Sequence, residues 1–237
     1  MFDEHTMETL EERARVEVRG GFEELDLIEE GMIELVEHDP DTEDALEADP
    51  DAATALVRSI LRRHVEAHAR EQEGFPEVTD TDRLDEVFAA LDADGIVVGQ
   101  NVGYTMSDLR DDMWEELGER PDARGWIGFH GQDLERVLDG GPLMLGFAHR
   151  SDQDADFVVV AGEVRDRLVA AGFEVEWDGD AGERLAVHGI TWQRRRSADG
   201  VLDDEPDEDG PDGEGPAPGG GSGGLFARAA RRLRGDD

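Results

Sequence analysis

Two histidines stand near the ends of two apolar runs in the middle of the chain, and a carboxylate follows the first of them. The run Trp126–Phe129 leads directly into His130, and Asp133 comes three residues later. The run Leu143–Phe147 is followed by His149. A histidine held by a carboxylate can act as a general acid and base. We therefore take His130, Asp133 and His149 as candidate catalytic residues; His149 would share an edge with His130 if the two strands ran parallel.

Two amide side chains extend this candidate site. Gln132 follows His130 at the expected start of a helix, where anions are favoured. Asn101 follows an earlier glycine-bounded apolar run, 95–99. Ligands in open α/β sheets gather beyond the carboxyl ends of strands, so Asn101 and Gln132 are candidate binding residues. A structural alternative stays open, in which Asp133 caps the helix and His130 bonds a carbonyl of the turn.

A second candidate site contains tryptophan and arginine. Trp177 and Trp192 lie on two alternating segments that predict a β-hairpin, and Arg194 and Arg195 follow directly. Trp and Arg are enriched in the hot spots of protein interfaces, so these four residues are candidate binding residues. The alternative is that both rings belong to the core.

A metal site finds little support in the sequence. His64 and His68 are four residues apart on a predicted helix, a spacing that can hold a metal. The zinc motif of this type has Glu directly after the first His, whereas Glu66 comes one position later and no third ligand is evident nearby. The absence of cysteine excludes cysteine-ligated zinc and iron–sulfur centres. We expect no metal and no cofactor.

Motifs of the common enzyme classes are also absent from the sequence. We find no serine elbow, no phosphate-binding loop and no dinucleotide-binding glycine fingerprint. The leading hypothesis is therefore a non-enzymatic protein-binding or regulatory module. The alternative is a small hydrolase or transferase in which His130 and Asp133 form an acid–base pair.

The elements that must position these residues follow from hydrophobic periodicity. Helical spacing of apolar residues, with caps and stop signals, predicts helices over 5–19, 22–37, 51–72, 79–93, 105–117, 134–138 and 157–171. Short apolar or alternating runs predict strands over 95–99, 125–130, 143–149, 173–177 and 185–192, the last with a bulge near Gly189. The predicted fold is α/β or α+β, with a mixed sheet of about five strands, packed helices and an N-terminal helical subdomain.

Changes in composition divide the chain into four parts. We expect an N-terminal helical subdomain over 1–78, an α/β core domain over 79–196, and an acidic, Gly/Pro-rich disordered linker over 197–224. A short basic amphipathic tail helix over 225–237 completes the chain. We expect this tail to dock on a protein partner, on an anionic membrane surface or on its own domain, through Leu225, Phe226, Arg228, Arg231, Arg232 and Leu233.

Charge sets the expected environment and excludes one class of partner. The chain has 61 acidic and 23 basic residues, all of the latter arginine, and a net charge of -38. Self-repulsion weakens in concentrated salt, where the Debye length is about 3 Å at 1 M against about 10 Å at 0.1 M. We expect an acidic, salt-adapted (halophilic), cytoplasmic protein that does not bind nucleic acid. We expect neither a signal peptide nor a transmembrane segment.

A resemblance to a known family covers residues 20–196. The segments that carry it are GIV at 95–97, GWIGFHGQD at 125–133, LMLGF at 143–147, WDG at 177–179 and WQRR at 192–195. The pattern resembles an uncharacterised bacterial family, a domain of unknown function. That family has no established activity, so the resemblance implies the extent of the domain and no particular chemistry.

Overall fold

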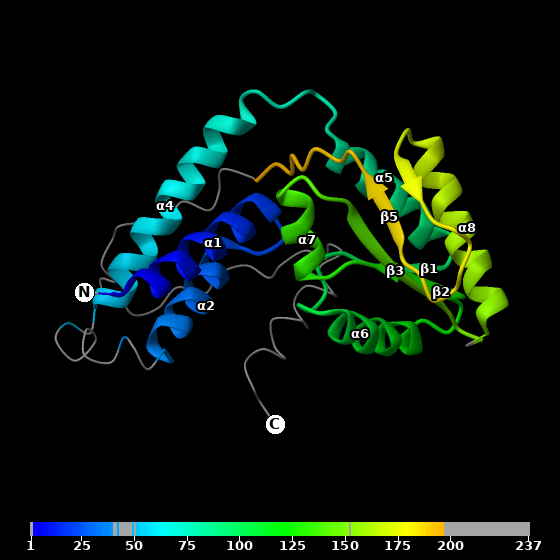
Figure 1. The fold of residues 1–237 in the computed structure, drawn as a ribbon, viewed down its shortest axis with the longest axis horizontal. Coiled ribbons are helices and arrows are strands. Elements are labelled where there is room, and N and C mark those ends of the chain that lie inside the picture. The colour runs from blue at the N-terminus through cyan, green and yellow to red at the C-terminus, as the bar shows by residue number, and fades with distance from the viewer. Residues whose placement is uncertain (1, 40–41, 43–48, 50, 152, 197–237) are drawn as a thin grey trace, which may run out of the picture.

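The computed structural model describes residues 2–39, 42, 49, 51–151 and 153–196. Within these ranges, a helical lobe from the first part of the chain lies beside an α/β lobe from the rest (Figure 1). The predicted fold class, with a mixed sheet of five strands, is confirmed. The predicted linker and tail helix lie outside the described residues. Among the described helices, none combines the length with the apolar run that crossing a bilayer requires.

The helical lobe consists of α1 (Glu4–Gly20), α2 (Leu25–Glu37) and α4 (Ala52–Gln72). The carboxylate of Asp3 starts α1 by accepting a hydrogen bond from the backbone N–H of Thr6 at 2.7 Å. The apolar stripes of the three helices face one another. They bury a core of their own, made of Leu10, Ala14, Val18, Leu25, Ile28, Met32, Val36, Ala53, Val57, Ile60 and Leu61.

The α/β lobe begins after this helical core. Its elements in the described part of the chain are α5 (Asp80–Ala93), β1 (Ile96–Gly99), α6 (Met106–Glu119), β2 (Gly125–Gly128), α7 (Gly131–Leu138), β3 (Leu143–His149), α8 (Asp154–Ala170), β4 (Glu174–Glu176) and β5 (Leu185–His188). The strand expected over 185–192 is shorter than predicted and ends at His188, because Gly189 adopts a φ of 69°.

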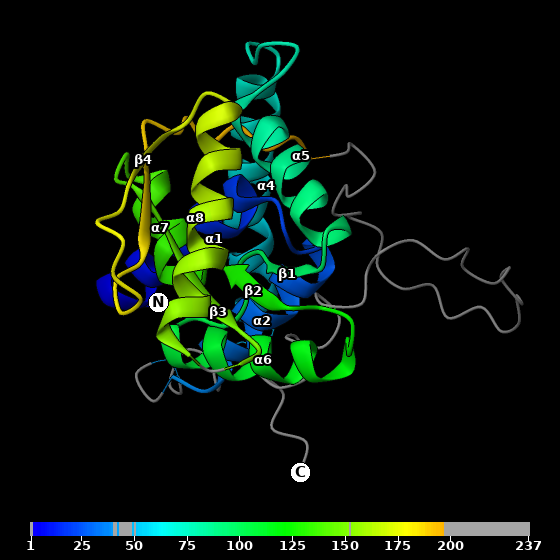
Figure 2. The same ribbon diagram turned by 90° about the vertical axis from the view of Figure 1, so that its right-hand side faces the viewer.

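The strands form one mixed sheet in the order β1-β2-β3-β5-β4. β1 and β2 run parallel, which requires the crossover through α6. All other neighbours are antiparallel. Figure 2 shows β1, β2 and β3 between α5 and α8 on one side and α6 on the other.

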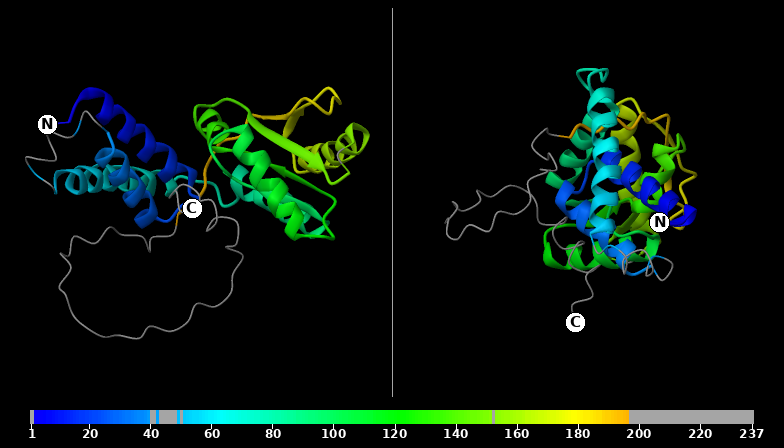
Figure 3. Two further views of the ribbon diagram at one scale, coloured as in Figure 1. Left: turned by 90° about the horizontal axis from the view of Figure 1, so that it is seen from below. Right: turned by 90° about the vertical axis from the view of Figure 1, so that its left-hand side faces the viewer.

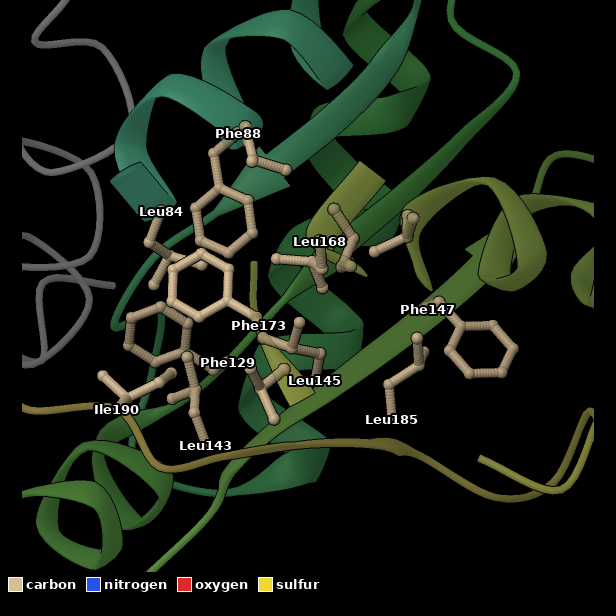
Figure 4. Packing of buried hydrophobic residues seen from close by; sticks show 14 of the residues in the cluster. Leu84, Phe88, Phe129, Leu143, Leu145, Phe147, Leu168, Phe173, Leu185 and Ile190 are labelled. Carbon is tan, nitrogen blue, oxygen red and sulfur yellow. The ribbon is translucent and has the colours of Figure 1, made fainter. Parts of the chain in front are cut away.

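Successive side chains of the strands belong to two apolar layers, one on each face of the sheet. Ile127 joins the layer that contains residues of α5 and α8, and the neighbouring Trp126 joins the layer that contains residues of α6. Figure 4 shows the first layer, where Leu84 and Phe88 of α5 approach Leu168 of α8 above the sheet. Burying a side chain of this size contributes about 1.5–3 kcal/mol, so these layers hold the sheet and its helices in one unit.

The last described segment, residues 190–196, ties the two lobes together. The indole N–H of Trp192 donates to the carbonyl of Gly20 at 3.4 Å. The guanidinium carbon of Arg194 lies 4.4 Å from the centre of the Phe22 ring, a cation–π contact. In Figure 3 this segment crosses from the α/β lobe to the helical lobe.

Candidate functional site

His130 and Asp133 lie together at the junction of β2 and α7. His130 is the residue before α7, and its Nε2 lies 3.1 Å from Oδ2 of Asp133. The side chain of His130 is 3% exposed and that of Asp133 is 0% exposed. The structure therefore brings this predicted pair together, but it places both groups inside the protein.

The carboxylate of Asp133 forms ion pairs with two arginines. Nη1 of Arg184 donates to Oδ2 at 2.8 Å, and Nη1 of Arg136 donates to Oδ1. Burial lowers the pKa of His130, although the charge of Asp133 opposes this shift. Nδ1 of His130 has no hydrogen-bond partner among the described residues. The cluster joins the start of α7 to the start of β5, and its burial favours the neutral form of the histidine beside a carboxylate that is already paired.

His149 does not join this cluster. β3 runs antiparallel to β2, and His149 pairs with Gly125 at the first residue of β2. His149 thus lies at the opposite end of the strand pair from His130. Its Nδ1 lies 2.9 Å from Oγ of Ser151. The condition for an edge shared with His130, that the two strands run parallel, is therefore not met.

The anion site expected at the start of α7 is already filled. The backbone N–H of Gly131 donates to the carbonyl of Gly103 at 3.0 Å, and the N–H of Gln132 donates to the carbonyl of Tyr104 at 3.3 Å. These amides are the ones that a bound anion would need. The loop after β1 takes the place of a ligand there.

Asn101 lies in that same loop, and it differs from Gln132 in its surroundings. It adopts a left-handed φ of 53°, which Asn tolerates better than most residues. Its Oδ1 is buried and has no hydrogen-bond partner among the described residues. Asn101 lines a large cleft, whereas Gln132 is exposed on the surface.

The two tryptophans of the second candidate site do not meet. Glu176 pairs with Ala186, so Trp177 follows β4 beside the start of β5, whereas Trp192 lies beyond the end of β5. Trp192 is buried at 6% exposure. Trp177 packs edge-on against Phe147, with 5.9 Å between ring centres.

The two arginines of that site are already paired. Arg194 donates to Asp85 at 2.7 Å, and Arg195 donates to Asp82 at 3.0 Å. The structure places Trp192 and Arg194 in the contact between the lobes and separates them from Trp177.

His64 and His68 have separate partners. Nε2 of His64 lies 2.9 Å from a carboxylate oxygen of Glu11. His68 is buried, and its Nε2 lies 3.0 Å from the carbonyl of Arg194. Burial lowers the pKa of His68. In the described ranges, no three His, Cys, Asp or Glu residues are arranged to hold a metal ion.

A cleft of about 1070 Å³ lies between the two lobes. Residues of α1 and α2 line one wall, and the loop after β1 together with the first turns of α6 and α7 lines the other. These elements face each other in Figure 1. Ten of the described lining residues are acidic: Glu8, Glu12, Glu17, Glu23, Glu30, Glu34, Asp108, Asp111, Asp112 and Glu135.

The positive charge in this cleft is small. Arg13 is the single arginine among the described lining residues, and its Nε pairs with a carboxylate oxygen of Glu17 at 2.9 Å. Burial raises the pKa of both Glu17 and Glu23, and the negative charge of Glu17 adds to the shift at Glu23. A raised pKa means that the negative form is insufficiently compensated.

The cleft also has an apolar part. Val16 and Ile28 are buried, and Leu27 and Leu35 are half-buried; we call these four apolar residues the floor of the cleft and its acidic lining residues the rim. The ring of Tyr104 is 52% exposed at the opposite wall. An apolar floor with an acidic rim fits a ligand that is itself amphipathic and positively charged.

The cleft lies apart from both sites predicted from the sequence, although it includes Asn101. Its signals are weak: Glu8 and Glu12 are four residues apart on α1, as are Glu30 and Glu34 on α2. Such spacing places acids on one helix face, but exposed faces of most helices in so acidic a chain look alike. Only the packing of the lobes turns these faces into one wall of a cavity.

The fold and the cleft define a two-lobed protein of helices and one mixed sheet, with an acidic cavity between its lobes. The chain belongs to the family described as Domain of unknown function (DUF6891), whose match covers residues 3–196. The resemblance inferred over 20–196 is confirmed, and the match begins earlier, so it includes α1 and its wall of the cleft. Neither a curated protein nor a solved structure matches the chain.

Proposed function

We propose that this chain is a cytoplasmic, non-enzymatic protein-binding module that holds a basic segment of a partner protein in the cleft between its lobes. One observation carries the proposal: ten of the 22 described residues that line the cleft are acidic, and one is arginine. Across the whole chain the acids number 61 of 237. The cleft thus has ten acids to one arginine, whereas the whole chain has 61 acids to 23 arginines.

Partial burial gives these carboxylates more effect than exposed ones. A charge pair near a protein surface interacts by about 4 kcal/mol at 4 Å when the effective dielectric constant is 20, against about 1 kcal/mol in water. Glu17 and Glu23 already have raised pKa values from burial. A guanidinium or ammonium group beside them would stabilise their charged form.

The size of the cleft favours a peptide over a small molecule. Pockets for small ligands measure about 300–1,000 Å³, and this cleft, at about 1070 Å³, lies just above that range. A groove with apolar residues along its floor suits an amphipathic helix or an extended segment. Arginine would gain further from the exposed ring of Tyr104 through a cation–π contact.

The rival hypothesis, a hydrolase or transferase that uses His130 and Asp133, has one supporting observation, the 3.1 Å contact between the two side chains. Their burial weighs against it, because an acid–base pair must reach its substrate. Neither residue lines the cleft, and Asp133 is paired with two arginines.

The test measures binding of a fluorescein-labelled peptide of eleven alternating arginine and alanine residues. The host is the full chain with Arg228, Arg231, Arg232 and Arg234 changed to Ser, named the tail-neutral chain, so that its own basic segment does not compete. Fluorescence anisotropy at 0.2 M and 2 M KCl gives the dissociation constants. We expect binding at both salt concentrations, and weaker binding at 2 M.

A triple variant then locates the binding site. Glu8→Gln, Glu34→Gln and Asp111→Asn neutralise three exposed acids of the cleft. The matched control neutralises three exposed acids elsewhere, by Glu77→Gln, Glu174→Gln and Asp122→Asn. We expect the cleft variant to bind at least ten times more weakly, which corresponds to about 1.4 kcal/mol. Equal loss in the two triple variants, or no binding by the tail-neutral chain, would overturn the proposal.

A further inference from the structure

The described part of the chain ends at the edge of the cleft. Nε of Arg196 donates to the carbonyl of Val18 at 3.0 Å, and Nη2 donates to the carbonyl of Glu17 at 3.3 Å. A further bond joins Nη2 to the carbonyl of Glu23. Glu17 and Glu23 both line the cleft. Whatever follows Arg196 in the sequence is therefore tethered beside this cavity.

The sequence that follows is long enough to return to the cavity. Residues 197–224 provide 28 positions between Arg196 and the basic segment, which we define as residues 225–234. A glycine-rich chain of this length has a root-mean-square span of about 30 Å, taking about 5–6 Å times the square root of the number of residues. A domain the size of residues 1–196 has a radius of gyration of about 16 Å. The cleft is thus within easy reach of the basic segment.

The chemistry of the basic segment complements the cleft. It contains four arginines, Arg228, Arg231, Arg232 and Arg234, and no acid. Leu225, Phe226 and Leu233 give it an apolar side. The cleft offers the reverse pattern, an acidic rim around the apolar side chains of Val16, Leu27, Ile28 and Leu35.

The distribution of charge before this segment also favours docking. The nine acids of residues 197–224 all fall between Asp199 and Glu214. The ten residues 215–224 that precede the basic segment carry no charge. The arginines can therefore enter the acidic cleft without bringing the repelling acids of the same stretch against its rim.

We infer that the basic segment 225–234 occupies the cleft of its own chain and must be displaced before a partner segment binds. The displacement step of this inference rests on the proposed function, because it requires a partner segment that binds in the same cleft. Tethering gives the segment an effective concentration in the millimolar range. Its contacts can therefore be individually weak and still compete with a partner. A partner segment then binds only when its affinity and concentration are high enough to displace the tethered segment.

The first experiment compares the labelled arginine–alanine peptide on the native chain and on the tail-neutral chain. We expect the tail-neutral chain to bind at least ten times more tightly, because its cleft is vacant. Equal and measurable affinity for both chains would overturn the inference and leave the proposed function standing. If neither chain binds the peptide, the proposed function fails, and the second experiment decides the inference.

The second experiment uses the absence of cysteine from the chain. Glu34→Cys in the cleft and Ala230→Cys in the basic segment are introduced together, and the yield of intramolecular disulfide is measured under mild oxidation. Glu77→Cys with Ala230→Cys is the control pair, since Glu77 is exposed and does not line the cleft. We expect at least a fivefold faster reaction for the cleft pair, and loss of that advantage in the tail-neutral chain.

Three results of the crosslinking would contradict the inference: equal rates for the two pairs, an advantage that survives in the tail-neutral chain, or crosslinks that form between chains and fall on dilution. The last result would assign the cleft to a basic segment of a second copy. Cleft crosslinking without peptide binding by either chain would support the segment as occupant and reject the partner.

Discussion

Oδ2 of Asp133 lies 3.1 Å from Nε2 of His130 and 2.8 Å from Nη1 of Arg184, at a carboxylate that has no exposed surface. This contact joins the residue before α7 to the residue before β5. It therefore fixes the start of a helix against the start of a strand that comes 54 residues later. We therefore interpret this contact as one that stabilises the fold.

Asp133→Asn is expected to destabilise the protein by about 3 kcal/mol, because removing one partner of a buried ion pair leaves the others uncompensated. The guanidinium groups of Arg136 and Arg184 are partly exposed, which keeps the loss at the lower end of the usual range. Urea unfolding followed by circular dichroism measures it. Asp139→Asn, at an exposed contact with Arg15, should cost under about 1 kcal/mol. Equal losses of unfolding free energy in the two variants would contradict this structural role of Asp133.

His68 and His130 make stability depend on pH below neutrality. Burial lowers the pKa of both rings from 6.5, so the unfolded chain binds protons more readily than the folded one. Their contribution is complete above about pH 6.5 and is lost as the pH falls towards the folded pKa values. We expect the double variant His68→Gln and His130→Gln to have a flatter profile of unfolding free energy between pH 7.5 and 5.

The control for this pH dependence is His5→Gln, since His5 is exposed. Burial raises the pKa values of Glu17 and Glu23, so these two groups change the unfolding free energy in the opposite direction. Their protonation as the pH falls removes the cost of burying a negative charge. They are present in the parent and in the variants, so the difference between profiles isolates the histidines. A double variant whose profile parallels that of the parent would refute the role of the two rings.

Gly128→Ala tests the close approach of β1 and β2. A Cβ at this position would lie 2.6 Å from the carbonyl oxygen of Gly99 and 3.0 Å from Cδ1 of Leu109. The strands must separate to accept it, at a cost of about 1–3 kcal/mol. Gly162→Ala in α8 meets no atom within 4 Å and should stabilise by about 0.5–1 kcal/mol. Thermal unfolding midpoints that move in the same direction would count against this explanation.

The net charge of -38 predicts that salt stabilises the fold. Raising KCl from 0.1 M to 2 M should raise the midpoint of urea unfolding, because repulsion among exposed carboxylates is screened within about 3 Å at 1 M. KCl is used because sulfate would also strengthen burial by exclusion from the surface. A midpoint that falls with KCl would show that charge repulsion is a minor part of the stability.

Local signals in the sequence predicted the elements well. The helix expected over 79–93 begins at Asp80, because Thr79 caps it: its Oγ1 accepts the N–H of Asp82 at 3.1 Å. Thr105 caps the helix expected over 105–117 in the same way, with Asp108 at the N3 position. Such signals involve residues three positions apart, so the chain carries the whole interaction within one turn.

Contacts between distant residues were not predictable in this way. The pattern of 143–149 identifies a strand but carries no information on its direction, and that direction decides whether His149 lies beside His130. The cleft is the stronger case: its two walls come from residues 5–35 and from 101–135. No periodicity in either segment indicates that they face each other.

The closure of the lobes has a consequence for the order in which the protein folds. The hydrogen bond from Trp192 to Gly20 joins residues 172 positions apart, and the bond from Arg196 to Val18 spans 178. During synthesis α1 is made first, yet the segment that fastens it to the sheet is made last among the described elements. Contacts of such long separation form slowly. The contacts that Trp192 and Arg196 make with α1 can therefore form only after nearly two hundred residues have been translated.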